Sequence, residues 1–208
     1  MKLININLDN YYLNPYKFIY KKDSDNIMDI IDNLINNNKV INTQTIDFNP
    51  LLFKLVANNN VTHLENILKN NKNININEQD KDGDTPLHIA IFLCNIKIIN
   101  ILLKYNANLL IKDKWGQIPI HRLCFSINDI KIIDLVNIFL KYNHNIFNEQ
   151  DNYGNTTLHL ILKHIIKNNI VLDDNHKILI KNIKKKMNTR LKNQDNQNIN
   201  DLIKLLKS

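Results

Sequence analysis

One eleven-residue stretch recurs along this chain and constrains its fold more than any other feature. It reads DKDGDTPLHIA at 80–90, DKWGQIPIHRL at 113–123 and DNYGNTTLHLI at 151–161. The only three glycines of the 208 residues, Gly83, Gly116 and Gly154, occupy the same place in each copy, at intervals of 33 and 38. A period of this length indicates one supersecondary unit that is built several times and stacked.

Each copy joins a tight turn to the start of a helix. The glycine supplies a backbone position that can take a positive φ in the turn. In the first copy Thr85 is placed to cap a helix, and Pro86 follows where its missing N–H costs nothing. Leu87 and Ala90 then fall on one helical face. The stretch therefore predicts a turn followed by an amphipathic helix.

The recurring stretch resembles the T-P-L-H core of ankyrin repeats, which have a period near 33 and consist of a β-turn and two helices. The resemblance covers about residues 47–208. It implies an all-α ankyrin-repeat solenoid in which helix-turn-helix pairs carry short β-hairpin fingers, with about four repeats plus terminal caps. It also implies that the histidine of each copy ties its turn to the neighbouring repeat by hydrogen bonds. The positions that carry the family pattern are Gly83, Thr85, Pro86, His88, Gly116, Pro119, His121, Gly154 and His159.

The repeats predict a division of the chain into a flank and a repeat domain. Residues 1–46 form the N-terminal flank, in which 16–22 suggest a short strand and 26–37 a capping helix. Residues 47–208 form the repeat domain. Its units run approximately over 47–79, 80–112, 113–150 and 151–193, with a partial cap at 194–208.

Apolar spacing predicts two helices in each repeat. The expected ranges are about 50–57 and 61–69, 86–93 and 96–105, 157–166 and 176–187, and a capping helix at 201–206. A longer connection is expected around 126–131. We expect Asn106 and Asn198 to stand in for glycines, and Cys94 and Cys124 to be reduced thiols on first helices.

Charge is concentrated at the C-terminal end. Up to residue 162 the chain has 16 basic and 16 acidic side chains, whereas residues 163–208 have 11 and 4, which account for the net charge of +7. The run is explained either by cations at a helix C-terminus or by a patch for nucleic acid, anionic membrane or nuclear import. Its residues are Lys181, Lys184, Lys185, Lys186, Arg190 and Lys192.

The sequence gives little support for catalysis or for a metal site. It has no phosphate-binding, dinucleotide-binding or nucleophile-elbow motif. His88, His121 and His159 stand one to a repeat and do not form a cluster. We therefore expect no enzyme, no cofactor and no metal. No apolar run is long enough to span a bilayer, and no signal peptide is recognisable, so we expect an intracellular, cytoplasmic protein, with the nucleus as an alternative.

The family resemblance places the partner on the hairpin tips and on the exposed side of each first helix, the concave face. Trp115 is the only tryptophan, and with Phe92, Phe125 and Tyr153 it is expected to form an aromatic patch. The alternative is that these rings pack on the next hairpin. The expected contact residues are Lys81, Asp82, Asp84, Phe92, Lys114, Trp115, Gln117, Phe125, Asn152, Tyr153, Asn155 and Lys163.

We therefore predict a non-catalytic protein–protein interaction module. Divergent repeats with an Asn, Ile and Lys bias resemble the ankyrin proteins of large DNA viruses, which implies a viral modulator of host signalling or ubiquitin pathways. The alternative function is binding of nucleic acid or an anionic surface through the basic C-terminal helix. We expect a monomer with an unidentified, possibly host, protein partner.

Overall fold

The computed structural model describes residues 48–71, 74–142 and 144–206. The chain folds as two compact units, residues 1–75 and 76–208. The strand expected at 16–22, the helix expected at 26–37 and the boundary expected at 46/47 lie outside the described residues. Among the residues described, every regular element is a helix. They are α3 (Phe48–Ala57), α4 (Val61–Asn70), α5 (Pro86–Phe92), α6 (Ile96–Lys104), η2 (Pro119–Ser126), α7 (Ile132–Tyr142), η3 (His144–Asn148), α8 (Thr157–Lys167), α9 (Asp174–Lys184) and α10 (Ile199–Leu205).

In the first unit the described residues form a helix pair, α3 and α4, which pack against each other. The side chain of Asn60 caps α4 by accepting a hydrogen bond from the N–H of His63 at 3.3 Å. The turn between the helices is closed by Asn59, which has a φ of 56°. Helical spacing predicts an inward face of Leu51, Leu52, Leu55 and Val56 on α3 and of Leu64, Ile67 and Leu68 on α4, and all of these side chains are buried. Phe53 is buried as well, which the spacing did not predict.

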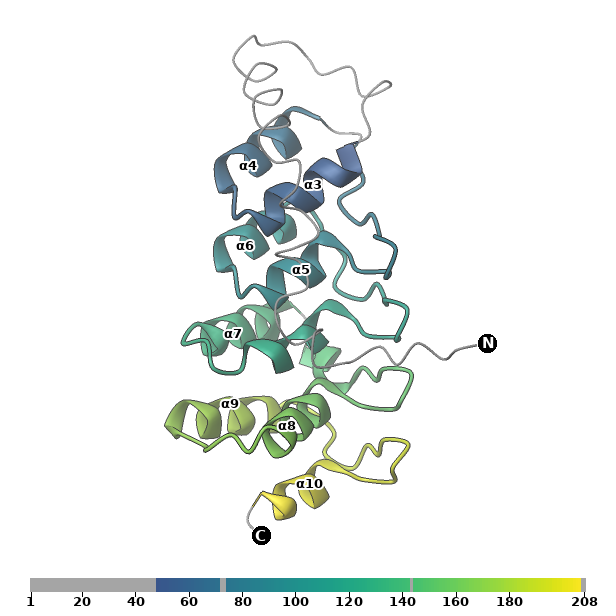
Figure 1. The fold of residues 1–208 in the computed structure, drawn as a ribbon, viewed down its shortest axis with the longest axis vertical. Helices are drawn as coiled ribbons and strands as arrows, with labels where there is room; N and C mark the ends of the chain where they lie inside the picture. The colour runs from purple at the N-terminus through teal and green to yellow at the C-terminus, as the bar shows by residue number, and fades with distance from the viewer. Residues whose placement is uncertain (1–47, 72–73, 143, 207–208) are drawn as a thin grey trace, which may run out of the picture. The chain divides into compact units, whose positions relative to one another are not determined.

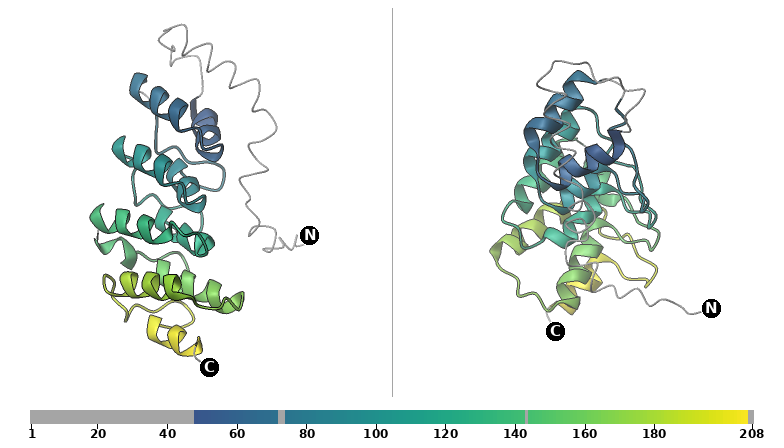
Figure 2. Two further views of the ribbon diagram at one scale, coloured as in Figure 1. Left: turned by 90° about the vertical axis from the view of Figure 1, so that its left-hand side faces the viewer. Right: turned by 45° about the horizontal axis from the view of Figure 1, so that its top comes forward.

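The second unit stacks successive helix pairs, which Figures 1 and 2 show one after another in chain order. The first helices α5, η2, α8 and α10 pack in sequence, and the second helices α7 and α9 pack beside each other. The inner face of α6 buries Ile98, Ile99 and Leu102 completely. This unit confirms the all-α solenoid predicted from the recurring stretch.

The first helix of the third repeat, η2, is a 3₁₀ helix of eight residues, which is long for this type. The N–H of His121 bonds to the carbonyl of Ile118 at 2.9 Å, an i→i+3 bond. Ile118 stands where the neighbouring repeats have Thr85 and Thr156, so its side chain offers no hydroxyl to the first turn. The missing cap accompanies the tighter winding.

The turn of each repeat, which we call a finger, is built in the same way at 80–84, 113–117, 151–155 and 193–197. Its first residue, Asp80, Asp113, Asp151 or Asn193, donates its N–H to the carbonyl four residues on and accepts from the N–H at that position with its side chain. The glycines have φ values of 81°, 75° and 74°. The fingers are thus closed turns rather than paired strands.

Two sequence assignments in these turns were wrong. Asn196, with a φ of 58°, takes the glycine position of the last finger, whereas Asn198 caps α10, which begins at Ile199. The glycine position is set by its distance from the first finger residue, Asn193, and not by its distance from the start of the helix. Cys94 lies just beyond α5 in the left-handed region, with a φ of 50°, because the helix has already ended at Phe92. Asn106 has the expected positive φ, 64°.

Consecutive fingers are joined by one backbone bond each. The N–H of Lys114 donates to the carbonyl of Asp82 at 3.1 Å, that of Asn152 to Trp115 at 3.0 Å, and that of Gln194 to Tyr153 at 2.9 Å. The glycines sit where the next finger approaches most closely. A Cβ on Gly116 would lie 2.8 Å from the backbone nitrogen of Asn152.

The histidines provide the second connection between repeats. In His88, Nδ1 accepts from the N–H of Thr85 at 3.0 Å, so Nε2 carries the proton and donates to the carbonyl of Gln117 at 3.0 Å. His121 and His159 bond in the same way to the carbonyls of Glu149 and Gln197, both at 3.1 Å. Burial lowers the pKa of His88 and of His121 to about 4.

A methyl group on the middle glycine should separate two fingers. We expect Gly116→Ala to lower the free energy of unfolding by about 2 kcal/mol or more, because a left-handed alanine costs 1–2 kcal/mol before any steric clash. Asn196→Gly, at the same position of the last finger, should be neutral or stabilising. Urea unfolding followed by circular dichroism measures both, and equal effects of the two substitutions would contradict the finger geometry.

Acid should destabilise the repeats before the carboxylates titrate. The folded pKa values of His88 and His121 lie below 6.5, so the unfolded chain binds protons more readily and stability falls as the pH drops from about 6.5 toward 4. Each of the two should contribute a loss on the order of 2 kcal/mol by pH 5. Urea unfolding at pH 7.5 and pH 5 measures this loss. NMR titration in which these two rings protonated near pH 6.5 would exclude it.

Candidate protein-interaction surface

The fingertips and the first helices lie on the same side of the second unit (Figure 1). Of the expected fingertip contacts, those exposed to solvent are Lys81, Lys114, Asn152 and Tyr153, and those partly exposed are Asp82, Trp115 and Gln117. Tyr153 is the most open aromatic ring among them, with 54% of its surface exposed.

Two expected contact residues are buried, and the expectation for them was wrong. Asp84 is 1% exposed and Asn155 is 5% exposed. Both are the last residue of a finger, where the chain turns inward to start the helix. Asp84 pairs with Arg122, and Asn155 accepts a hydrogen bond from the side chain of Asn193 at 3.1 Å. Neither side chain is available to a partner.

Arg122 is a buried charged residue that sequence reasoning missed. Its Nη2 lies 2.6 Å from a carboxylate oxygen of Asp84 and 2.6 Å from one of Asp113, and its Nη1 donates to the side chain of Gln117 at 3.0 Å. It therefore links two fingers through their buried acids. The available signal was an arginine beside the tie histidine of one repeat, with aspartates in the two fingers that precede it.

Trp115 lies over this cluster. The guanidinium carbon of Arg122 is 5.6 Å from the centre of its ring, and Nζ of Lys114 is 4.4 Å away. Lys114 also forms an ion pair with Asp82 of the preceding finger. Trp115 is therefore held by cation–π contacts and remains partly exposed. Both cations belong to the same repeat as Trp115, whereas the alternative expectation placed the ring on the next hairpin.

The same cluster contains the described residues best placed for a metal, Asp84, His88 and Asp113, whose ligand atoms lie within 4.8 Å of one another. A guanidinium already stands between the two carboxylates. Both ring nitrogens of His88 are engaged in the tie to Gln117 and in the cap of its own helix. The arrangement satisfies these groups with protein partners, so we do not propose a metal site there.

Three consecutive first helices bring a ring onto one face, in what we call the ring ladder: Phe92 of α5, Phe125 of η2 and His164 of α8. The ring centres of Phe92 and Phe125 are 5.8 Å apart, and those of Phe125 and His164 are 6.2 Å apart in an edge-on arrangement. All three rings are partly exposed. Burial, followed by the charge of Lys167, lowers the pKa of His164, which keeps the ring neutral at neutral pH.

The remaining expected contact and the basic run lie toward the C-terminal end. Lys163 of α8 forms an ion pair with Asp195 of the last finger at 2.7 Å.

Helix α9 runs from Asp174 to Lys184, so it begins and ends earlier than the expected 176–187. Only Lys181 and Lys184 of the basic run are therefore helical. The other four are exposed residues of the following segment: Lys185, Lys186, Arg190 and Lys192.

Removal of the buried cation should be far more costly than removal of an exposed one. We expect Arg122→Gln to reduce the free energy of unfolding by about 3–5 kcal/mol, because it leaves Asp84 and Asp113 buried without their cation. Lys114→Gln, which breaks the exposed pair with Asp82, should cost less than about 1 kcal/mol. Chemical unfolding of both variants tests this, and a loss at Arg122 as small as that at Lys114 would contradict it.

Comparisons with known proteins agree with this geometry. Residues 21–113 match the family model for ankyrin repeats in three copies. The chain is 26% identical over 124 residues to ankyrin repeat protein R96 of Acanthamoeba polyphaga mimivirus, 46% over 68 residues to ankyrin repeat protein FPV245 of Fowlpox virus, and 42% over 65 residues to an ankyrin repeat protein of Rickettsia bellii. These matches cover 53%, 32% and 29% of this chain.

The chain spans only part of each relative, 12%, 15% and 39% of their respective lengths. No helix among the described residues is long and apolar enough to cross a membrane. Ankyrin repeats are in general non-catalytic modules for protein–protein interaction. The family match, the viral and bacterial relatives, and the finger and histidine pattern that continues to residue 197 all agree. By sequence over residues 21–113 and by fold, the chain is similar to the ankyrin-repeat family.

Proposed function

We propose that this chain is a non-catalytic binding module that holds a partner protein on the face formed by its first helices and fingers. The observation that carries the proposal is the ring ladder of Phe92, Phe125 and His164. Three successive repeats place partly exposed rings in contact along one face. Aromatic side chains are enriched among the residues that dominate binding energy.

The surroundings of the ladder match the anatomy of an interface. Protein interfaces have an apolar centre and a polar rim. Here the exposed fingertip residues Lys81, Lys114 and Asn152 supply polar groups beside the first helices, and Tyr153 adds an amphipathic ring. Trp115 lies on a finger with one face against cations. A partner that crosses several fingers would meet all of these groups.

The reactive side chains support a non-catalytic role. Burial raises the pKa of both Cys94 and Cys124 to about 12, so the thiolates that nucleophilic chemistry needs are not formed at neutral pH. His88 and His121 are neutral and are bonded at both nitrogens. These groups serve the stacking of the repeats.

The resemblance to viral ankyrin proteins extends the proposal to location and role. Mimivirus and fowlpox relatives favour a protein that acts inside a host cell, in the cytoplasm or nucleus, on host signalling or ubiquitin pathways. Binding of nucleic acid through the basic run remains the alternative. It predicts an affinity for DNA or RNA that falls steeply between low and physiological salt.

Loss of the ladder should release the partner. Partners are captured from native cells with the unaltered chain and identified by mass spectrometry, and their affinities are then measured with purified variants. We expect Phe92→Ala with Phe125→Ala to weaken binding by about 1–3 kcal/mol, or roughly 5- to 150-fold. Trp115→Ala should weaken it in the same direction.

The matched control is Tyr142→Ala, which removes an exposed ring, 56% exposed, from the second helix α7. It should leave the affinity unchanged. Circular dichroism and thermal unfolding of each variant separate loss of binding from loss of fold. A partner that binds the ladder variants as tightly as the unaltered chain would overturn the proposal.

A further inference from the structure

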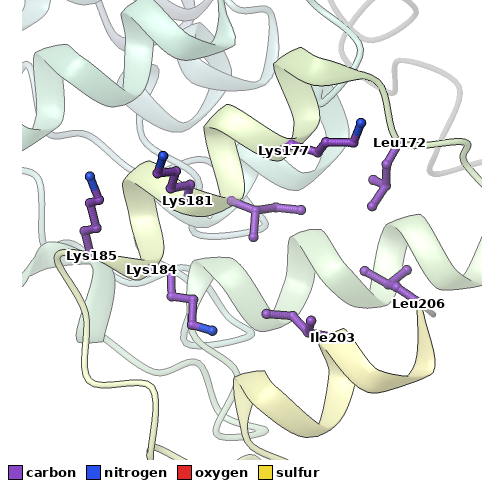
Figure 3. Close-up of a pocket in the computed structure, with 8 residues that line it drawn as sticks. Leu172, Lys177, Lys181, Lys184, Lys185, Ile203 and Leu206 are labelled. Carbon is purple, nitrogen blue, oxygen red and sulfur yellow. The ribbon is translucent and has the colours of Figure 1, made fainter.

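A groove away from the ring ladder lies between α9 and α10 (Figure 3). Its volume is about 500 Å³. Four aliphatic side chains form its floor: Leu172 before α9, Ile180 within it, Ile203 of α10, and Leu206 just after α10. All four are partly exposed. Apolar surface is thus left open to solvent between α9 and α10.

The position of the groove follows from the order of the repeats. Second helices pack side by side in this fold, as α7 and α9 do, and α10 is a first helix because it follows a finger. The groove therefore runs between a second helix, α9, and a first helix, α10. A groove between two helices accommodates a third helix, because the ridges of one helix pack into such grooves.

The rim of the groove is cationic. Lys177, Lys181, Lys184 and Lys185 line it, and Figure 3 shows all four on the α9 side of the aliphatic floor. Lys177 has a partner in Asp174 at 3.0 Å, but both side chains are exposed, so this pair is weak. The end of the chain that carries the groove also carries the whole excess of positive charge.

We propose that this groove binds an amphipathic helix of a partner protein. The apolar side chains of that helix lie on Ile180 and Ile203, and its acidic side chains face the lysines. Helices bind to grooves through apolar anchors at i, i+3, i+4 and i+7, and acidic flanks complement a lysine rim. The lining contains aliphatic side chains and lysines but no ring for base stacking. A lipid surface is flat, so it would not fill a concave apolar floor. The site is distinct from the ring ladder and does not depend on it.

The test uses the full chain and a designed probe. The probe is a fluorescent peptide of about 16 residues with leucines at i, i+3, i+4 and i+7 and glutamates beside them. We expect it to bind with a Kd in the micromolar range by fluorescence anisotropy. Lys181→Glu with Lys185→Glu should weaken binding by about tenfold or more. Lys186→Glu with Arg190→Glu changes the net charge equally outside the groove and should alter it by less than about threefold.

The apolar half is tested on the probe, so that the fold of the protein is not disturbed. Peptides with serine in place of leucine, or lysine in place of glutamate, should bind at least about tenfold more weakly. The proposal is overturned if the two double variants of the protein weaken peptide binding equally, or if the unaltered peptide does not bind. It is also overturned if duplex DNA or phosphatidylserine vesicles bind more tightly than the peptide and lose affinity in the Lys181 and Lys185 variant.

Discussion

The structure depends on buried polar bonds that each repeat can complete only with the next one. The Nε2 protons of His88 and His159 are donated to carbonyls of the next finger, and that of His121 is donated to the carbonyl of Glu149, just before the next finger. A buried donor without a partner costs 1–3 kcal/mol. These hydrogen bonds therefore fix the direction and register of the stacking, in addition to the burial of apolar area, because a shifted repeat would leave the donors unsatisfied.

The same requirement decides which polar residues remain for function. The last residues of two fingers make contacts between repeats, which is why Asp84 and Asn155 are buried. Residues at the tips, such as Lys114 and Tyr153, face solvent. In both of our proposals, binding is carried by side chains that stay at least partly exposed after the repeats have stacked, as those of the ring ladder and of the groove beside α9 do.

Prediction succeeded where the repeat imposes one local geometry. Helical spacing identified the buried faces of α3, α4 and α6, and the left-handed Asn106 followed from its place after a second helix. It failed at the last finger, where the absence of glycine removed the marker and Asn196 was misplaced by two residues. The ends of α9 also could not be read, because polar residues flank it on both sides without a strong stop signal.

The sequence by itself determined the repeated unit, its order along the chain and the identity of the histidine ties, because these depend on local turn chemistry and on a fixed period. Only the tertiary structure decided that Arg122 is enclosed by Asp84 and Asp113, that Phe125 contacts both Phe92 and His164, and that lysines at α9 line one side of an apolar groove. Each of these joins residues from different repeats. Their contacts depend on the distance and rotation between stacked units, which no single repeat encodes.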